Sequence, residues 1–272
     1  MKASSTIKLV VPGVAALVGC LTLRDTLSPS PAIADARSIG ASQRAEKKSF
    51  TDSQIIDGFL KTAFGAEYHL AGRVDRIRKY QMPVRVFVDG SIRADRHKQI
   101  GKVVRDIAAR IQHLDIAVAN ERDHANIIIT LVRDRDLQKT ISSFYGPEKA
   151  KEIHDSLDPQ CLSGFRKNEN YEIQGSDVIL TVDNGDFVFL DCAYEELLQS
   201  LGPINDTDTV PWTMFNDQVS MGYFGVYDQY ILNILYDPRI KAGMTVDEVR
   251  AVLPSVLPDV RAWVAKINDL PK

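Results

Sequence analysis

Residues 190–206 read LDCAYEELLQSLGPIND, and this stretch predicts one helix together with its end. Apolar residues recur there at spacings of three and four, which gives the helix one apolar face made by Leu190, Tyr194, Leu197, Leu198 and Leu201. Gly202 stands where a left-handed C-cap is expected. On another face, Glu195 and Gln199 project side by side one turn apart, with Glu196 beside them. Polar groups therefore converge on a helix whose pattern otherwise indicates burial.

The spacing of these polar residues resembles the signature of the metzincin metalloproteases. In that signature, H-E-x-x-H-x-x-G-x-x-H-D, three histidines bind zinc and the glutamate activates water. Glu195, Gln199 and Asn205 stand at the three zinc-ligand positions. The residues that match the signature by type are Glu196, Gly202 and Asp206. The resemblance implies a metal site in which oxygen donors replace every imidazole, with Glu196 as the candidate general base and with Glu195, Gln199, Asn205 and Asp206 as the candidate ligands.

Length and composition are those of an ordinary globular protein. The chain has 272 residues, of which 44% are hydrophobic and 25% charged, enough for one large domain or for one domain with appendages. The formal net charge is -3, and the basic residues are scattered among acidic ones. This charge gives no general attraction to nucleic acid or to anionic membranes, so nucleic acid is excluded as an expected partner.

Residues 1–34 have the order of a secretory signal. Two lysines precede the apolar run 9–23, and an A-x-A cleavage site ends at Ala34. The alternative is the sequence LVGC at 17–20, which resembles the lipobox of bacterial lipoproteins and would place a lipid anchor on Cys20. An uncleaved anchor is a third interpretation, although the apolar run is shorter than a typical membrane span. The first two interpretations export the protein, to the periplasm or beyond, and leave no membrane span once the signal is removed.

Two cysteines, Cys161 and Cys192, remain after removal of the signal. In an oxidising compartment, such a pair in a domain otherwise poor in cysteine is most simply one disulfide. That bridge would pin the start of the central helix to the segment that precedes the strands before it. A nucleophilic Cys192 is the alternative, but no histidine lies near it in the sequence.

The first half of the chain predicts the opening of a parallel β-α-β unit. Residues 35–48 are small and polar and are expected to form a flexible leader. A helix with a capping box at Thr51 follows. The next elements are a strand over 83–88, a long helix over 93–114 and a buried strand over 126–132. Metzincin catalytic domains open with the same order of elements.

Two polar helices over 137–157 are interpreted as an insertion, and strands are expected over 176–182 and 186–190 on either side of a hairpin dipeptide, Asn184-Gly185. Further on, Met214 is the candidate for the methionine turn that metzincins place beneath their metal. The segment 227–236 resembles the closing helix of matrixin-type domains. The C-terminal extension 245–272 begins with a capping box, and Pro254 and Pro258 predict two short helices there.

Three motifs also resemble an uncharacterised bacterial family of exported proteins, domain of unknown function 2927. They are the run at 195–206, the triplet Phe215-Asn216-Asp217, and Leu235-Tyr236-Asp237-Pro238-Arg239 before Gly243-Met244. The resemblance covers the chain from Phe59 to Met244 and implies no established activity. Pro203, where the family pattern has leucine, is a departure that concerns the turn geometry only.

The expected fold is therefore α+β and zincin-like, a mixed twisted sheet with a long N-terminal helix and a central motif helix over 49–244, plus the helical extension. The first function hypothesis is an exported, non-catalytic binding module with a degenerate metal site, needing no cofactor, whose partner is a protein or peptide of the cell envelope. The second is a metal-dependent hydrolase of the peptidase or amidase class, which uses zinc or a harder divalent cation such as Ca²⁺, Mg²⁺ or Mn²⁺ with Glu196 as base. The third is a purely structural one, in which Glu195 and Gln199 are a solvated stripe. A separate alternative for the acidic loop is a Ca²⁺-binding cluster made by Asp206, Asp208, Asn216 and Asp217, although acidic loops are usually only solvated.

Overall fold

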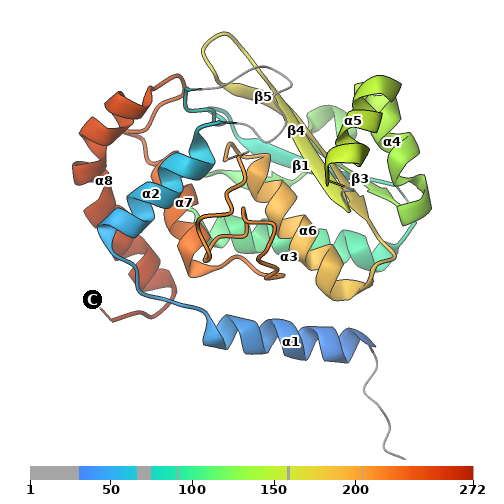
Figure 1. Ribbon diagram of the computed structural model, residues 1–272, viewed down its shortest axis with the longest axis horizontal. Coiled ribbons are helices and arrows are strands. Elements are labelled where there is room, and N and C mark those ends of the chain that lie inside the picture. Colours follow the sequence, from blue (N-terminus) through green and yellow to red (C-terminus); the bar gives the residue numbers. More distant parts are fainter. Residues whose placement is uncertain (1–30, 66–74, 91, 158–159, 204, 272) are drawn as a thin grey trace, which may run out of the picture.

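The computed structural model of the chain describes residues 31–65, 75–90, 92–157, 160–203 and 205–271. Within these ranges the chain is an α+β fold in which helices surround one mostly parallel sheet (Figure 1), which confirms the expected class. The strands are β1 (Val84–Asp89), β2 (Ile116–Val118), β3 (Ile127–Val132), β4 (Cys161–Lys167) and β5 (Ile173–Thr181). The main helices are α1 (Pro31–Ala45), α2 (Asp52–Ala63), α3 (Ala94–Arg110), α4 (Leu137–Tyr145), α5 (Pro147–Leu157), α6 (Gly185–Gln199), α7 (Val226–Tyr236) and α8 (Val246–Ile267).

The sheet has the strand order β2-β1-β3-β5-β4. Strands β1, β2, β3 and β5 run parallel to one another, and β4 pairs antiparallel with β5 at the edge. The predicted β-α-β opening is confirmed, because α3 connects β1 to the parallel strands beside it. The edge strands β2 and β4 were not predicted. The first has only three residues, and the second contains a glycine and two basic residues, so neither has a clear period of two.

A different set of helices packs against each face of the sheet. Because side chains alternate along a strand, Val178 and Leu180 of β5 point into the main core while Ile179 points to the other face. The main core contains the apolar faces of α3 and α6. Ile179 instead joins a smaller core beneath α4 and α5, to which Ile141 and Ile153 contribute. The predicted insertion is thus a helical pair that covers one face of the sheet near its β4 edge.

Helix α6 begins at Gly185, which corrects the predicted strand over 186–190 and the predicted hairpin at Asn184-Gly185. The reason is a tertiary contact made by Arg96, which is 1% exposed. Its guanidinium pairs with Asp186 in the first turn of α6, donates to the carbonyl oxygen of Gly185 and lies 4.4 Å from the ring centroid of Phe189. An acidic residue in a first turn also favours a helix start. These contacts fix as helix a stretch whose alternating pattern is typical of a strand.

Both ends of the described chain also differ from expectation. Residues 31–45 form α1, where a flexible leader was expected over 35–48, and α1 packs against α6. The C-terminal extension forms one helix, α8, and not two. Pro254 and Pro258 lie on its exposed face, so water can reach the carbonyl groups that the two prolines leave without a helical donor. None of the helices within the described ranges is long and apolar enough to cross a membrane. Residues 1–30 of the predicted signal, with Cys20, lie outside those ranges, and residues 31–34 at the predicted cleavage site belong to α1.

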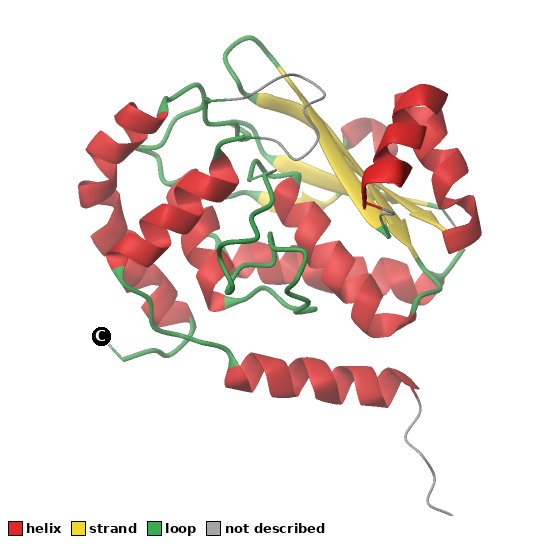
Figure 2. Cartoon of the chain, viewed as in Figure 1, coloured by secondary structure: helices red, strands yellow, loops and turns green. Residues whose placement is uncertain are grey.

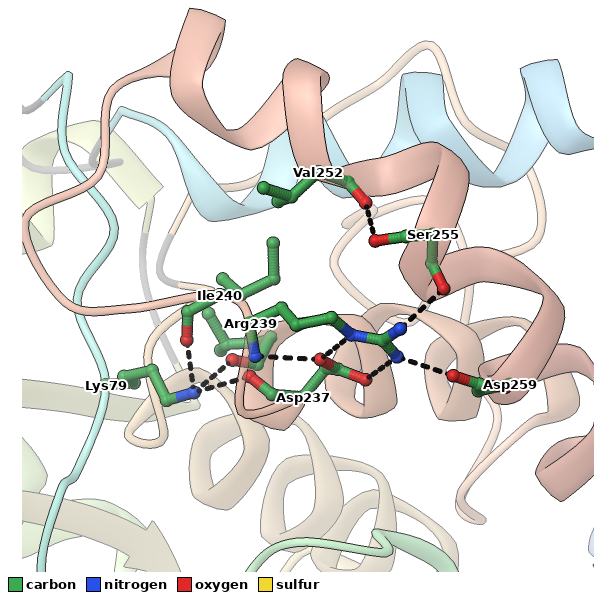
Figure 3. A network of polar contacts seen from close by, with 8 residues as sticks. Lys79, Asp237, Arg239, Ile240, Val252, Ser255 and Asp259 are labelled. Atoms are coloured by element: carbon green, nitrogen blue, oxygen red, sulfur yellow. Dashed lines mark hydrogen bonds and ion pairs between the residues drawn. The ribbon is translucent and has the colours of Figure 1, made fainter.

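The motif at 235–239 ties α7 to its neighbours (Figure 3). The buried ammonium of Lys79 donates to the carbonyl oxygens of Leu235, at 2.7 Å, and Ile240, at 2.8 Å, so it satisfies carbonyl groups at and just beyond the end of α7. Arg239 donates to the carboxylate of Asp237 and to Asp259 of α8. This motif therefore stabilises packing.

Gly202 provides a test of the turn that ends α6. Its φ is 140°, which side chains rarely adopt, and a Cβ there would clash with the carbonyl oxygen of Arg78. We expect Gly202→Ala to lower the free energy of unfolding in urea by about 2 to 4 kcal/mol, from backbone strain and overpacking together. Gly146→Ala is the matched control, because Gly146 has a φ of 85° but open space around it. Equal losses in the two variants would contradict the close approach at Gly202.

Candidate functional site

The site is built from α6 and from the loop 205–225, which connects α6 to α7 and is drawn as loop throughout in Figure 2. Helix α6 presents Glu195, Glu196 and Gln199 beside β4 and this loop. Glu196 and Gln199 are 7% and 4% exposed, while Glu195 is partly buried. The interpretation of these residues as a solvated stripe therefore does not describe their surroundings.

Three carboxylates meet at this place. Glu195 of α6 and two loop residues, Asp206 and Asp217, each have an oxygen within 4.8 Å of the others. Glu195 and Asp206 are among the sequence-predicted ligands, whereas Asp217 does not fall on the metzincin spacing. Its position depends on the path of the loop, which the sequence pattern does not encode.

The electrostatics of Glu195 reflect this crowding. Burial raises the pKa of its carboxyl well above the ordinary value, and the negative charges of Glu196, Asp206, Asp191 and Asp217 raise it further. Within the described part of the chain, the charged neighbours that shift this pKa are acidic. A group in such surroundings favours a bound proton or a bound cation.

Gln199 holds one of the carboxylates in place. Its amide nitrogen donates to Asp206 at 2.7 Å, and its amide oxygen accepts from the hydroxyl of Ser163 on β4 at 3.4 Å. Both ends of the amide are thus used. Gln199 is therefore a positioning residue for Asp206.

Asn205 does not join the carboxylates. Its amide nitrogen donates to the carbonyl oxygen of Lys61 at the end of α2, and its amide oxygen lies beside Gly65, where it would contact any added side chain. Zinc does not fit the residues at the three positions of the metzincin signature, because one amide is turned away and the other is hydrogen bonded at both ends. Nor, among the residues the structure describes, does a histidine or cysteine belong to any group of potential metal ligands.

Glu196 interacts electrostatically with Tyr145, the last residue of α4. Burial raises the pKa of the Tyr145 hydroxyl to about 12, and the nearby charges of Asp177 and Glu196 contribute to this shift. Glu196 is therefore within electrostatic reach of both Glu195 and Tyr145. Its side chain is buried in a helix that packs against the edge strand β4.

The predicted disulfide joins this edge to the site helix. Cys161, the first residue of β4, is bonded to Cys192 of α6, and their Cα atoms are 5.9 Å apart. The bridge closes a loop with a sequence separation of 31 residues, which by chain entropy stabilises the fold by roughly 3 to 4 kcal/mol. The bridge thus links the strand that carries Ser163 to the helix that carries Gln199.

The methionine-turn candidate, Met214, is 1% exposed and anchors the loop from the other side. Its backbone N–H donates to the buried carboxylate of Asp228 on α7 at 3.1 Å, and the hydroxyl of Thr213 donates to the same carboxylate at 2.5 Å. The loop is therefore fixed to α7 between its two carboxylate-bearing segments.

A cavity of about 540 Å³ lies beside Asp206 and Asp217. Its other lining residues are Lys61, Phe64, Asn205, Thr207, Asp208, Thr209, Asn216 and Gln218. Two of the three carboxylates, those of Asp206 and Asp217, thus line a cleft that a ligand can enter.

Asp228 gives the fold a testable pH dependence. Burial raises the pKa of its carboxyl to about 7, above the ordinary 3.8. Between these values the folded protein holds a proton that the unfolded chain has lost, so the free energy of unfolding should fall as pH rises from about 4 to about 7, by up to about 4 kcal/mol from this group. We expect Asp228→Asn to flatten the fall measured by urea unfolding from pH 4 to 8. The pKa values of Glu46, Asp191 and Glu195 are also raised, so part of the trend should persist.

The control for this measurement is Asp123→Asn, which changes an exposed carboxyl. If the free energy of unfolding changes with pH equally in the unmodified protein and in Asp228→Asn, Asp228 is ionised in the folded protein over the whole range from pH 4 to 8.

The comparisons with known proteins agree with the sequence motifs. A family model described as protein of unknown function DUF2927 matches residues 52–255, which is most of the chain and includes α6, the loop and α7. Neither the curated proteins nor the solved structures that were compared with the chain gave a significant match. The chain belongs to the family of proteins of unknown function DUF2927.

Proposed function

We propose that this protein is an exported, non-catalytic binding module on a metzincin-like fold, in which a group of carboxylates holds a hard divalent cation where metzincins hold zinc. The observation that carries the proposal is the meeting of Glu195, Asp206 and Asp217 within 4.8 Å, beside a cleft that the two aspartates line. Export is supported by the secretory pattern of residues 1–34 and by the disulfide. A protein or peptide of the cell envelope would then bind in the cleft, beside the bound cation.

The donor set favours Ca²⁺ over zinc. Carboxylate oxygens are hard ligands, which suit Ca²⁺, Mg²⁺ and Mn²⁺, whereas zinc prefers nitrogen and sulfur. A Ca²⁺ ion holds its oxygens at about 2.4 Å, so two ligands on one ion lie at most about 4.8 Å apart. Each pair of these carboxylates has oxygens within this limit. Asp217 is exposed and Glu195 is partly buried, so water can complete the coordination from the cleft.

The likeness to a metzincin fold has two supports beyond the signature. A β-α-β unit opens the domain and the motif helix follows the sheet, and the Met214 turn is anchored to the closing helix α7. The burial of Glu196 supports a non-catalytic role, since 7% exposure leaves little of its side chain available to a water molecule or substrate.

Cation binding can be tested with charge-neutralising variants. We expect Ca²⁺ to bind the purified protein with one site in calorimetry and, at 100 times its Kd, to stabilise it by about 2.7 kcal/mol. Glu195→Gln and Asp217→Asn should weaken binding at least about tenfold, because each removes a charged ligand. Without Ca²⁺ the same variants should be as stable as the unmodified protein or more so, since each relieves repulsion.

The matched control is Asp208→Asn, which removes a loop charge that lines the cleft but does not belong to the carboxylate group. Its affinity for Ca²⁺ should stay within about twofold of the unmodified value. If all three variants lose Ca²⁺ affinity equally, the binding reflects general electrostatic attraction and not a specific site. If the unmodified protein does not bind Ca²⁺, the proposal is overturned.

A second candidate function is a cation-dependent hydrolase of the peptidase or amidase class. It is favoured by one observation, the electrostatic contact of Glu196 with Glu195, which places a carboxylate next to the proposed cation. In this case Glu196→Gln should abolish hydrolysis of peptide and amide substrates measured with Ca²⁺ or Mn²⁺, while Ca²⁺ affinity stays close to normal. Absence of hydrolysis in the unmodified, cation-loaded protein favours the binding module.

A further inference from the structure

A short segment before α2 contacts the loop that carries two of the three carboxylates. We call this segment, Glu46 to Phe50, the latch. Phe50 is 5% exposed, and its ring lies 5.6 Å from the Trp212 ring and 4.8 Å from the Tyr227 ring, measured between centroids. Arg261 of α8 donates to the carbonyl oxygen of Phe50 at 2.7 Å. The latch is therefore a packed part of the fold.

The charged residues of the latch reinforce the same contact. The ammonium of Lys47 lies 3.9 Å from the centroid of the Trp212 ring, a favourable cation–π distance. The carboxylate of Glu46 accepts from the backbone N–H of Val226 at 3.2 Å, at the beginning of α7. The latch thus joins the loop to the first turn of α7, where Glu46 accepts from an N–H group that has no partner within the helix.

Trp212 stands in the loop between Asp206 and Asp217. The loop is also fixed by Gln199 at Asp206, by Asp228 at Met214, and by Asp191, whose carboxylate accepts from the N–H groups of Met221 and Gly222. Of these anchors, Gln199, Asp191 and Asp228 belong to helices α6 and α7. The contact at Trp212 differs from them, because it depends on a segment that precedes the first helix of the matched family domain.

We propose that the latch regulates the carboxylate site, by setting the position of the loop through Trp212 and thereby the affinity for the cation. This proposal rests on the proposed function. A partner that binds residues 46–50 would release Trp212 and weaken cation binding. By linkage, a bound cation would tighten the latch by the same factor.

The test measures Ca²⁺ affinity and Trp212 fluorescence in latch variants. All proteins carry Trp263→Phe, so that Trp212 is the one remaining tryptophan. Lys47→Ala removes the exposed cation–π contact with Trp212, and Phe50→Leu removes the aromatic pair. Each should weaken Ca²⁺ binding by about two- to fivefold and should shift Trp212 emission. The matched control is Lys98→Ala, which removes an exposed lysine on α3.

Reciprocity supplies a second readout that a purely structural role would not change. Ca²⁺ should slow tryptic cleavage after Lys47 and Lys48 in the unmodified protein by the factor that the variants lose in affinity. In Glu195→Gln, which lacks a cation ligand, Ca²⁺ should leave that cleavage rate unchanged.

The outcomes separate the two proposals. If the unmodified protein binds Ca²⁺ and the latch variants bind it equally well, the latch proposal is overturned and the cation site stands. Variants that unfold at lower temperature with unchanged affinity for Ca²⁺ overturn the latch proposal in the same way, because the latch would then be structural only. If the unmodified protein binds no Ca²⁺, the proposed function itself fails.

Discussion

Repulsion among Glu195, Asp206 and Asp217 is the constraint on which the site depends. Two unit charges less than 5 Å apart near a protein surface repel by a few kcal/mol, and the partial burial of Glu195 adds a cost for desolvation. Left to itself, a loop would move its carboxylates apart. Their proximity therefore requires a structure that holds the loop in place and a positive charge or proton that offsets the repulsion.

The fold supplies the first requirement from two sides. The disulfide fixes the middle of α6 to the edge of the sheet, where Ser163 donates to Gln199 and Gln199 holds Asp206. On the far side, the buried carboxylate of Asp228 binds the loop at Met214. Several of these anchors are themselves polar and buried, which makes them costly unless paired. A protein that maintains such a network has a specific loop conformation to preserve, which is why we connect the network to a ligand.

The sequence predicted the scaffold better than the site. Capping boxes at Thr51 and Thr245, the long apolar period of α3 and the paired cysteines are local signals, and the structure follows each of them. Local pattern failed where a distant side chain decides the outcome: Arg96 makes 186–190 helical although its alternation is typical of a strand. For the same reason the metzincin spacing did not predict that the amide of Asn205 bonds to Lys61 of α2, and it does not include Asp217. The path of a long loop depends on contacts with side chains that are distant in the sequence, and a single sequence does not reveal these contacts.

A crystal structure of the protein grown with Mn²⁺, which shares the oxygen preference of Ca²⁺ and has a strong anomalous signal, tests the central claim most directly. We predict one anomalous peak bound by carboxylate oxygens of Glu195, Asp206 and Asp217, with Asn205 still directed at α2. A map without a peak among these three carboxylates, or with an ion bound instead by histidines, would contradict the claim.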